Sequence, residues 1–227
     1  MIAPLDLAQN TSPTYHAAAG SLFEVQEAFE FGVSGVVRAD PVAVLCCAPD
    51  LVYHSLPGVE CFNASRDVRS FVGGVPVVAH PVCAPWSAYC AHQWKPIEGV
   101  RDLGPLCVHW LRKCGGVLEH PAHSRLFEHC NLPRPGESKD GLWTIEVSQA
   151  WWGYSMLKKT WLVFCGLEPA EVMPTIPSRK HHSRSGEGDR RRQQRMSKHQ
   201  RAATVPTLAR WLVETARRAK RPTEYTQ

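Results

Sequence analysis

Residues 73–87 read GGVPVVAHPVCAPWS and join a short apolar run to a loop that carries a cysteine between two prolines. The run at 75–79 predicts a buried strand, because two glycines introduce it and its residues are apolar without alternation. Similar runs predict further strands at 42–48, 59–63, 116–120 and 160–166. Apolar strands separated by helical segments are typical of an α/β sheet in which most strands are parallel.

The clearest helix is predicted over 102–114, DLGPLCVHWLRKC. Its apolar residues recur at helical spacing and form one stripe, made of Leu103, Leu106, Cys107, Trp110, Leu111 and Cys114. Pro105 suits the first turn, and Gly115-Gly116 ends the helix. We therefore expect an α/β fold, a Rossmann-like three-layer domain with a mostly parallel sheet.

Changes in composition divide the chain into four predicted segments. Residues 1–40 are expected to be weakly structured or to form a short helix, and residues 41–170 to form the catalytic α/β domain. Residues 171–203 mix Pro, Ser, Gly and Arg without periodicity, which predicts a basic flexible linker. Residues 204–221 then predict a C-terminal helix.

The charge is distributed unevenly along the chain. From Arg179 to Arg221 there are 14 Lys and Arg against three acids, net +11, whereas the rest has 12 basic and 18 acidic residues, net −6. A basic arm on an acidic body indicates a polyanionic partner, nucleic acid first, although a solvated tail that aids solubility is the alternative. The arginines expected to contact phosphates are Arg190, Arg191, Arg192 and Arg195.

The nine cysteines are spread over the chain, and several lie inside apolar runs, where cysteine behaves as a small hydrophobe. The N-terminal residues lack the basic region of a signal peptide, so we expect reduced thiols and a cytoplasmic location. No apolar run approaches the roughly 18 residues of a membrane span, so no membrane association is expected.

Reactive or charged side chains follow three of the predicted strands. Asp67 comes after the second strand, Cys83 after the third, and Glu119 ends the fourth. Ligands of open α/β sheets bind beyond the carboxyl ends of the strands, so these side chains are expected at one edge. Cys83, in a loop stiffened by Pro81 and Pro85, is a candidate nucleophile. The competing interpretations are a small buried cysteine and, for the glutamate, a structural ion pair.

Metal binding is a competing interpretation of the cysteines and histidines. The crowded groups are Cys83, Cys90 and His92, and Cys114, His120, His123, His129 and Cys130. The sequence has neither the C-x-x-C nor the H-x-x-x-H spacing that is typical of zinc sites, so no metal is expected.

These motifs resemble those of cytosine-5 DNA methyltransferases. That family carries a Pro-Cys loop with an aromatic residue and a serine after it, a Glu-Asn-Val strand, and a Tyr-Gly…Gln-Arg-x-Arg segment. The matching residues are Cys83, Trp86 and Ser87 in the loop, Glu119 in the strand, and Gly153 and Lys158 in WWGYSMLKKTWLVFCG. The departures are Val82, Ala84, His120 and Thr160, and the family's Gly-rich S-adenosylmethionine motif is not recognisable.

Residues 42–215 also resemble a group of small phage-encoded proteins with a "HPPC…W" loop, a "GGVLEHP" strand, a "WWG" segment and a "TPP…LAxWLV" end. This second resemblance covers more of the chain and implies no activity by itself. It implies that the cytoplasm is that of a bacterial host.

The methyltransferase resemblance implies a DNA base as substrate, a pyrimidine attacked at ring carbon 6 by the Cys83 thiolate. Glu119, protonated or hydrogen-bonded, would hold ring nitrogen 3 and stabilise the negative charge delivered to the ring. It implies S-adenosylmethionine as cofactor, with Asp67 contacting the cofactor's adenine or the substrate. The other residues expected in the site are His80, Trp86, Ser87, His120 and Lys158, the two histidines at equivalent strand ends. The basic arm and a loop at 134–143 would contact DNA from which the base is flipped.

Two alternatives stay open beside DNA methylation. One is a phage enzyme that modifies bases or nucleotides without S-adenosylmethionine. The other is a non-catalytic accessory protein that binds nucleic acid. The missing Gly-rich motif favours both alternatives.

Overall fold

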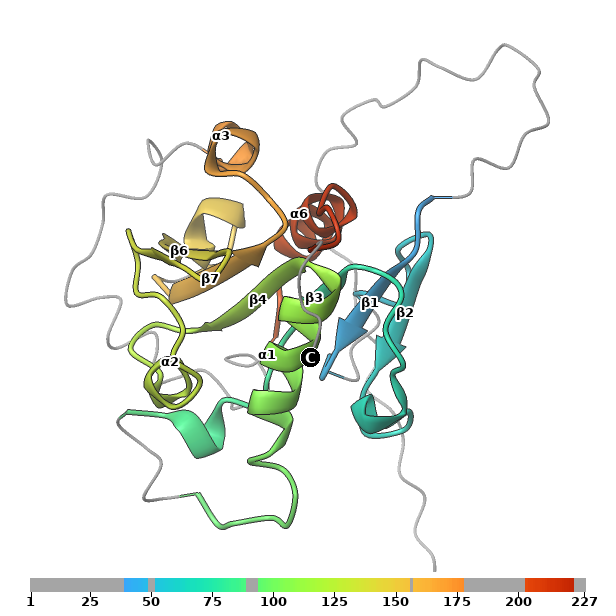
Figure 1. Cartoon of the computed structure of the whole chain (residues 1–227), viewed down its shortest axis with the longest axis vertical. Coiled ribbons are helices and arrows are strands. Elements are labelled where there is room, and N and C mark those ends of the chain that lie inside the picture. Colours follow the sequence, from blue (N-terminus) through green and yellow to red (C-terminus); the bar gives the residue numbers. More distant parts are fainter. Residues whose placement is uncertain (1–38, 49–51, 89–93, 156, 178–202, 223–227) are drawn as a thin grey trace, which may run out of the picture. The chain divides into compact units, whose positions relative to one another are not determined.

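The described residues contain seven strands, which form one sheet in the order β2-β1-β3-β4-β7-β6-β5 (Figure 1). The computed structural model describes residues 39–48, 52–88, 94–155, 157–177 and 203–222. Nearly all of the predicted N-terminal segment, and most of the basic linker with its four arginines, lie outside the described residues. Among the helices that are described, none has the length and apolar character needed to cross a bilayer.

Four short strands form the parallel half of the sheet. They are β1 (Val42–Leu45), β2 (Val59–Phe62), β3 (Val77–Ala79) and β4 (Gly116–Pro121). Every pairing among them is parallel. All residues of β1 and β3 are buried, because both faces of these strands are covered, and this explains their continuous apolar runs. The strands predicted at these positions are confirmed.

The antiparallel half consists of β5 (Ser138–Lys139), β6 (Leu142–Ser148) and β7 (Lys159–Cys165). β7 lies between β4 and β6 and pairs antiparallel with both, and β5 pairs antiparallel with β6. The prediction of a mostly parallel sheet is therefore wrong: the sheet is mixed, with three parallel and three antiparallel pairings among the described strands. The α/β class itself is confirmed.

The antiparallel pairing of β6 with β7 has a local reason. η4 (Gln149–Trp152) and a short loop join β6 to β7 at the same end of the sheet. A parallel pair would need a crossover connection that passes over the sheet, and no such segment separates these two strands.

Two long helices pack on opposite faces of the sheet (Figure 1). α1 (Leu103–Cys114) buries Leu111 on the face to which Leu45 and Ala79 point. α6 (Pro206–Arg217) buries Leu212 on the face of Val44 and Val78. The short helices are η1 (Val68–Ser70), η2 (Ala84–Trp86), α2 (Arg125–His129), η4, α3 (Pro169–Val172) and η5 (Met173–Thr175).

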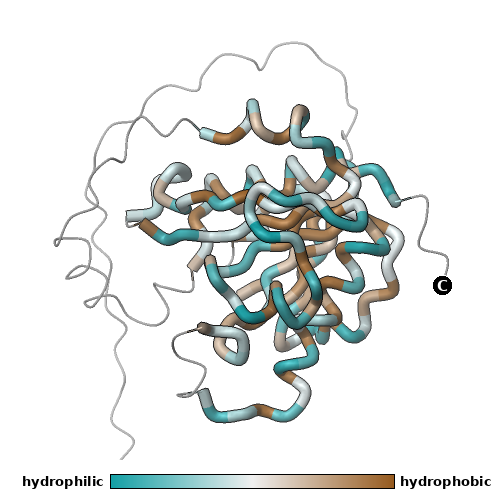
Figure 2. The backbone as a smooth tube through the Cα atoms, turned by 60° about the vertical axis from the view of Figure 1, so that its left-hand side comes forward, coloured by the Kyte–Doolittle hydropathy of each residue, from teal (hydrophilic) through white to brown (hydrophobic). Residues whose placement is uncertain are grey.

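Alternate residues of each central strand therefore enter two separate apolar clusters, one under each helix. Figure 2 shows hydrophobic residues along the inner strands and hydrophilic residues in the surrounding loops. The predicted C-terminal helix is confirmed over Pro206–Arg217, and its buried residues belong to the same core as the strands.

Candidate functional site

The order of the strands reverses beside β1, since β2 lies on one side of it and β3 on the other. In α/β sheets, ligands bind outside the carboxyl ends of the strands at such a point. Leu45, Ala79 and Leu118 are register partners across β1, β3 and β4. The residues that follow them, Cys46, His80 and Glu119, therefore lie at one level of this edge.

A chain of hydrogen bonds passes through Glu119. Its Oε2 lies 3.0 Å from His80 Nδ1, and its Oε1 accepts a hydrogen bond from Gln149 Nε2 at 2.9 Å. The chain extends to the Tyr53 hydroxyl, 2.6 Å from His80 Nε2, and to Thr160 Oγ1, 3.1 Å from Gln149 Nε2. The side chains of His80 and Glu119 are each 11% exposed. Four other residues, from separate parts of the fold, thus hold one carboxylate in a fixed orientation at a shielded edge of the sheet.

This carboxylate is ionised near neutral pH. Burial alone would raise the pKa of Glu119, but the hydrogen bond from His80 and the charge of Lys158 overcome it and lower that pKa to about 2. The charges of His80 and His120 act in the same direction. An ionised carboxylate can only accept hydrogen bonds, and it has lone pairs left beyond the two that His80 and Gln149 engage.

Cys83 lies in the loop after β3 and is exposed. It directly precedes η2, where its carbonyl accepts a hydrogen bond from the Trp86 backbone N–H at 3.0 Å. Desolvation by the surrounding protein raises the pKa of the thiol, the Glu119 charge raises it further, and Lys158 lowers it. The resting side chain is therefore a thiol. Because Glu119 and Lys158 both act on it, the three groups share one electrostatic environment.

Trp86 anchors the Cys83 loop instead of facing a ligand. Its side chain is enclosed, with 1% exposed, and packs where Gly104 of α1 leaves room: a Cβ on that glycine would lie 2.7 Å from Trp86 Nε1. The Arg101 guanidinium lies 4.3 Å from the centre of the ring, and Ser124 Oγ donates to the Trp86 carbonyl at 3.3 Å. The expectation that Trp86 contacts substrate or cofactor is corrected, because an enclosed ring offers no surface to a ligand.

His120 does not share the cleft of His80, contrary to expectation. Neighbouring residues of a strand point to opposite faces, so Glu119 lies on the α6 side of β4 and His120 on the α1 side. His120 is 1% exposed, and the interaction of its ring with the Pro81 backbone raises its pKa less than burial lowers it. Burial lowers its pKa to about 4, so the ring is neutral near pH 7. It is a core residue in this structure.

The remaining predicted residues lie at or near the same edge. Lys158 immediately precedes β7, with Nζ 5.5 Å from the centre of the Tyr154 ring, and its charge reaches both Glu119 and Cys83. Ser87 ends η2 and is partly exposed.

Asp67 is exposed and serves a local structural role. It accepts a hydrogen bond from the Arg69 backbone N–H at 2.8 Å and pairs with the Arg69 guanidinium at 2.9 Å. Its charge also acts on Cys46 at the end of β1. Asp67 therefore lies on the β1–β2 side of the edge, with its carboxylate already engaged.

Sequence reasoning missed three members of the Glu119 network. Tyr53 lies between the first two predicted strands, and Gln149 and Thr160 are ordinary polar residues on either side of the Trp-Trp-Gly motif. Gln149 and Thr160 are almost fully buried, and a buried amide needs partners. That requirement becomes visible only when the burial is known.

The end of β1 does not fit S-adenosylmethionine in the way that the resemblance implies. Cys46 has φ 57, a backbone conformation that favours glycine, yet it carries a side chain whose Sγ lies 3.6 Å from Cys107 Sγ of α1. A Gly-rich exit lets the backbone approach a ligand closely, and here a packed thiol takes that place.

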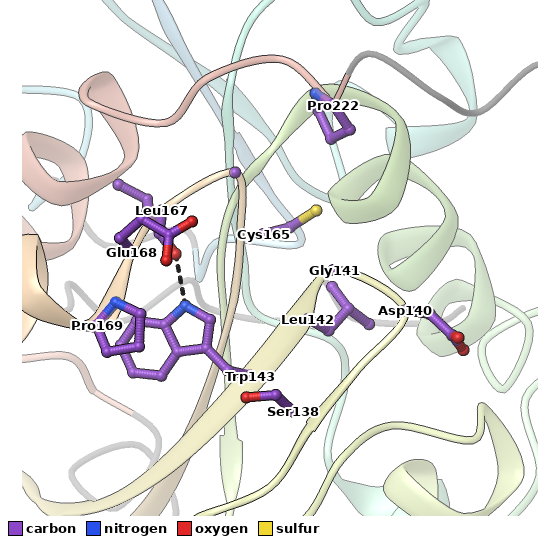
Figure 3. Close-up of a pocket in the computed structure, with 11 residues that line it drawn as sticks. Ser138, Asp140, Gly141, Leu142, Trp143, Cys165, Leu167, Glu168, Pro169 and Pro222 are labelled. Atoms are coloured by element: carbon purple, nitrogen blue, oxygen red, sulfur yellow. Dashed lines mark hydrogen bonds between the residues drawn. The ribbon is translucent and has the colours of Figure 1, made fainter.

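Two cavities among the described residues lie away from Cys83 and Glu119. One, of about 590 Å³, is beside the end of β7, where Trp143 Nε1 donates to the Leu167 carbonyl at 2.6 Å (Figure 3). Since Cys165 pairs with Gly116, this cavity belongs to the opposite edge of the sheet from Glu119. The other, of about 830 Å³, lies beside α2 and is lined by residues that include Arg134.

Among the described residues, the group Cys114, His120, His123, His129 and Cys130 considered from the sequence does not come together at ligand distance. Of the other group, Cys90 and His92 lie outside the described residues. In the described part of the chain, the group of three potential metal ligands whose ligand atoms all lie within 4.8 Å of one another is Cys47, His54 and Cys61. They lie on the β1–β2 side of the molecule.

Comparison with known proteins adds no relative to this picture. No protein-family model, no curated protein and no solved structure matches the chain.

Proposed function

We propose that this chain modifies a pyrimidine base of DNA through a Cys83 nucleophile, in a Rossmann-like three-layer domain similar to that of cytosine-5 DNA methyltransferases. One observation carries the proposal. The exposed Cys83 thiol and the ionised Glu119 carboxylate, which hydrogen bonds hold in place, are at the edge where α/β sheets bind ligands. The positive charge of Lys158 lowers the pKa of both groups.

The covalent step follows from these groups. After Cys83 gives its proton to solvent, its sulfur bonds to ring carbon 6 and the carbon 5–carbon 6 π bond breaks. The electron pair is delocalised over carbon 5 and ring nitrogen 3, and ring nitrogen 3 takes a proton from solvent. Lys158 stabilises the thiolate by its charge, as its effect on the pKa of Cys83 indicates. Carbon 5 then takes an electrophile or a proton, and loss of the carbon 5 hydrogen with expulsion of the sulfur restores the aromatic ring.

The ionised Glu119 favours cytosine among the pyrimidines. Its free lone pairs accept hydrogen bonds, and cytosine presents its N4 amine as a donor. Thymine presents O4, an acceptor, at the same position and would leave the carboxylate facing another negative dipole. A base inside a duplex must be flipped out to reach this edge, at a cost of a few kcal/mol.

The test needs no knowledge of the methyl donor. Reversible attack on carbon 6 exchanges the carbon 5 proton with solvent, so DNA incubated with the protein in deuterated water should gain deuterium at carbon 5 of cytosine. Cys83→Ser should abolish the exchange, and Cys130→Ser, at a partly exposed thiol on the far end of α2, should leave it unchanged. Absence of exchange with single-stranded and duplex DNA alike would refute the base adduct.

The alternative without S-adenosylmethionine is favoured by one observation, the packed Cys46 side chain at the end of β1. No step of the mechanism is therefore assigned to that cofactor. Nucleoside mass spectrometry of DNA from cells that express the wild type, with Cys83→Ser as control, distinguishes the two: 5-methylcytosine indicates a methyl donor, and another adduct mass indicates the alternative.

DNA as partner also stays a proposal, carried by the charge asymmetry of the sequence. If the basic arm contacts phosphates, DNA affinity should fall steeply with salt. Replacing Arg190, Arg191, Arg192 and Arg195 with glutamine should flatten that dependence; an unchanged slope would reduce the arm to a tail that aids solubility. DNA binding with no base exchange would instead favour the non-catalytic accessory protein. The expected location is cytoplasmic, in a bacterial host if the chain is phage-encoded.

A further inference from the structure

We propose that Cys47, His54 and Cys61 form a binding site for Zn²⁺, separate from the Glu119 network. Their two sulfur atoms and one imidazole nitrogen all lie within 4.8 Å of one another. The three residues follow one another at intervals of seven positions and lack the C-x-x-C spacing of zinc fingers, so the fold brings the group together.

The two sulfurs meet because β1 and β2 are parallel neighbours. Val44 pairs with Cys61, and the Cys47 N–H continues the pairing with a hydrogen bond to the Phe62 carbonyl at 3.1 Å. The left-handed conformation of Cys46, φ 57, interrupts the strand alternation there. Cys46 consequently packs on the α1 side, while Cys47 turns to the α6 side, where Cys61 also lies.

His54 completes the group from the turn that precedes β2. The residue is exposed, so its ring can adjust to a metal without disturbing the core. The neighbouring Tyr53 is 1% exposed and fixes the turn through its hydroxyl, 2.6 Å from His80 Nε2. The imidazole is thus carried on an anchored turn beside two largely buried thiols.

The ligand set selects the metal. Thiolate and imidazole ligands suit Zn²⁺ and other soft or borderline transition metals, and they do not suit Mg²⁺ or Ca²⁺. In a tetrahedral site with Zn–S bonds near 2.3 Å, two ligand sulfurs lie about 3.8 Å apart. Closure by about 1 Å would bring the three atoms to bonding positions. Three protein ligands leave the fourth position to water or another donor.

Cys46 and Cys107 make an instructive contrast. Their sulfurs are also close, at 3.6 Å, on the opposite face of the sheet. Among the described residues, no histidine joins them in a group of ligand distance. Thiol proximity alone therefore does not define the proposed site; the imidazole does.

The test is direct zinc binding by the reduced full-length protein. Competition with a chromophoric chelator gives the affinity and stoichiometry, and Co²⁺ gives a thiolate charge-transfer band that reports sulfur coordination. We expect one equivalent per chain. His54→Asn, at an exposed position that should not disturb folding, should weaken zinc binding at least about tenfold, since even residues that only support metal ligands cost that much. Cys47→Ser combined with Cys61→Ser should abolish the charge-transfer band.

Matched controls use the same residue types outside the group. His109→Asn, on the exposed side of α1, and Cys130→Ser should bind zinc as the wild type does. Equal zinc affinity in the wild type and in His54→Asn would overturn the site, as would equal losses in the controls. Formation of a Cys47–Cys61 disulfide in air at the same rate with and without zinc would also overturn it, because coordinated thiolates are protected. None of these measurements depends on base modification.

Discussion

The parallel and antiparallel halves of the sheet differ in length, in connection and in what they contribute to the candidate site. The parallel strands β1 and β3 have four and three residues, all buried, and they end in loops that carry Cys46, His80 and Cys83. The antiparallel strands β6 and β7 have seven residues each and are joined locally. They bring Gln149 and Thr160 to the carboxylate of Glu119.

The difference indicates that the two halves of the sheet, on either side of β4, supply different parts of the candidate site. Reactive groups lie in loops after the parallel strands, where the backbone leaves the sheet and can face a ligand. The groups that orient Glu119 come partly from the antiparallel half, whose long ladder of hydrogen bonds makes a rigid support. Glu119 stands on the strand that the two halves share, paired with β3 on one side and β7 on the other.

The largest expected effect comes from glycines at positive φ in the two halves. Gly116, at the start of β4 with φ 124, would place a Cβ 2.0 Å from the Val77 carbonyl oxygen, whereas Gly141, with φ 71 in the β5–β6 turn, has no atom within 4 Å of such a Cβ. Gly116→Ala should therefore cost about 3–5 kcal/mol or prevent folding. Gly141→Ala should cost only the backbone strain, about 1–2 kcal/mol. Urea unfolding measures the free energy of unfolding of both variants. Similar losses of stability would show that the backbone of the parallel half can move to accept a Cβ as easily as the β5–β6 hairpin can.

A smaller effect is expected where the antiparallel half supports Glu119. Gln149→Leu removes a donor from a buried carboxylate and should cost about 1.5–3 kcal/mol of stability. It should also slow the deuterium exchange on cytosine. Thr144→Val is the matched control, since Thr144 in β6 is buried and its hydroxyl has no hydrogen-bond partner. It should be neutral or stabilising. If Gln149→Leu leaves both readouts unchanged, the antiparallel half does not hold the carboxylate.

The pH dependence of stability separates the two faces of β4. The pKa of His120 is lowered from 6.5 to about 4, so the unfolded chain binds a proton that the folded one refuses, and stability falls as the pH drops through that window. The pKa of Glu119 is lowered from 4.5 to about 2, so the unfolded chain binds a proton between these pH values that the folded chain does not. The free energy of unfolding therefore continues to fall as the pH drops from 4.5 to about 2. His120→Leu should remove the loss between pH 6.5 and 4 and keep the loss below it. Unfolding free energies measured over this range check the shape, and an unchanged curve would contradict it.

The smallest effects are expected from exposed ion pairs, one in each half. Arg66 contacts Glu60 at 3.1 Å beside β2, and Lys159 contacts Glu146 at 2.9 Å between β7 and β6. Arg66→Met and Lys159→Met should each cost less than about 1 kcal/mol, and less still at high salt. A larger loss at either position, insensitive to salt, would mean that this pair supports its half of the sheet by packing and not by charge.

Local signals in the sequence were sufficient for five strands and two long helices. Buried parallel strands appear as continuous apolar runs. The helices α1 and α6 show helical periodicity, with a proline in the first turn of each, a glycine after the end of α1 and basic residues at the end of α6. The β5–β6 hairpin also had a local signal that the loop interpretation of 134–143 overlooked. Asp140-Gly141, with φ 51 and 71, is the dipeptide that two-residue hairpin turns prefer.

Direction and proximity were decided only in the tertiary structure. The apolar run of β7 reads the same whether its neighbour is parallel or antiparallel, because strand periodicity carries no information about the partner. The sequence also could not place His80 and His120 on opposite faces of the sheet. The face to which a strand residue points depends on the register of that strand with its neighbours.

By itself the sequence determined the α/β class, the basic C-terminal arm and the position of Cys83 and Glu119 at strand ends, because composition and short-range periodicity encode these features. Only the tertiary structure decided that Tyr53, His80, Gln149 and Thr160 hold Glu119, or that Cys47, His54 and Cys61 meet. The physical reason is that a hydrogen bond or a metal site requires atoms within a few ångströms. For residues separated along the chain, sheet pairing and burial set those distances, and local sequence preferences do not.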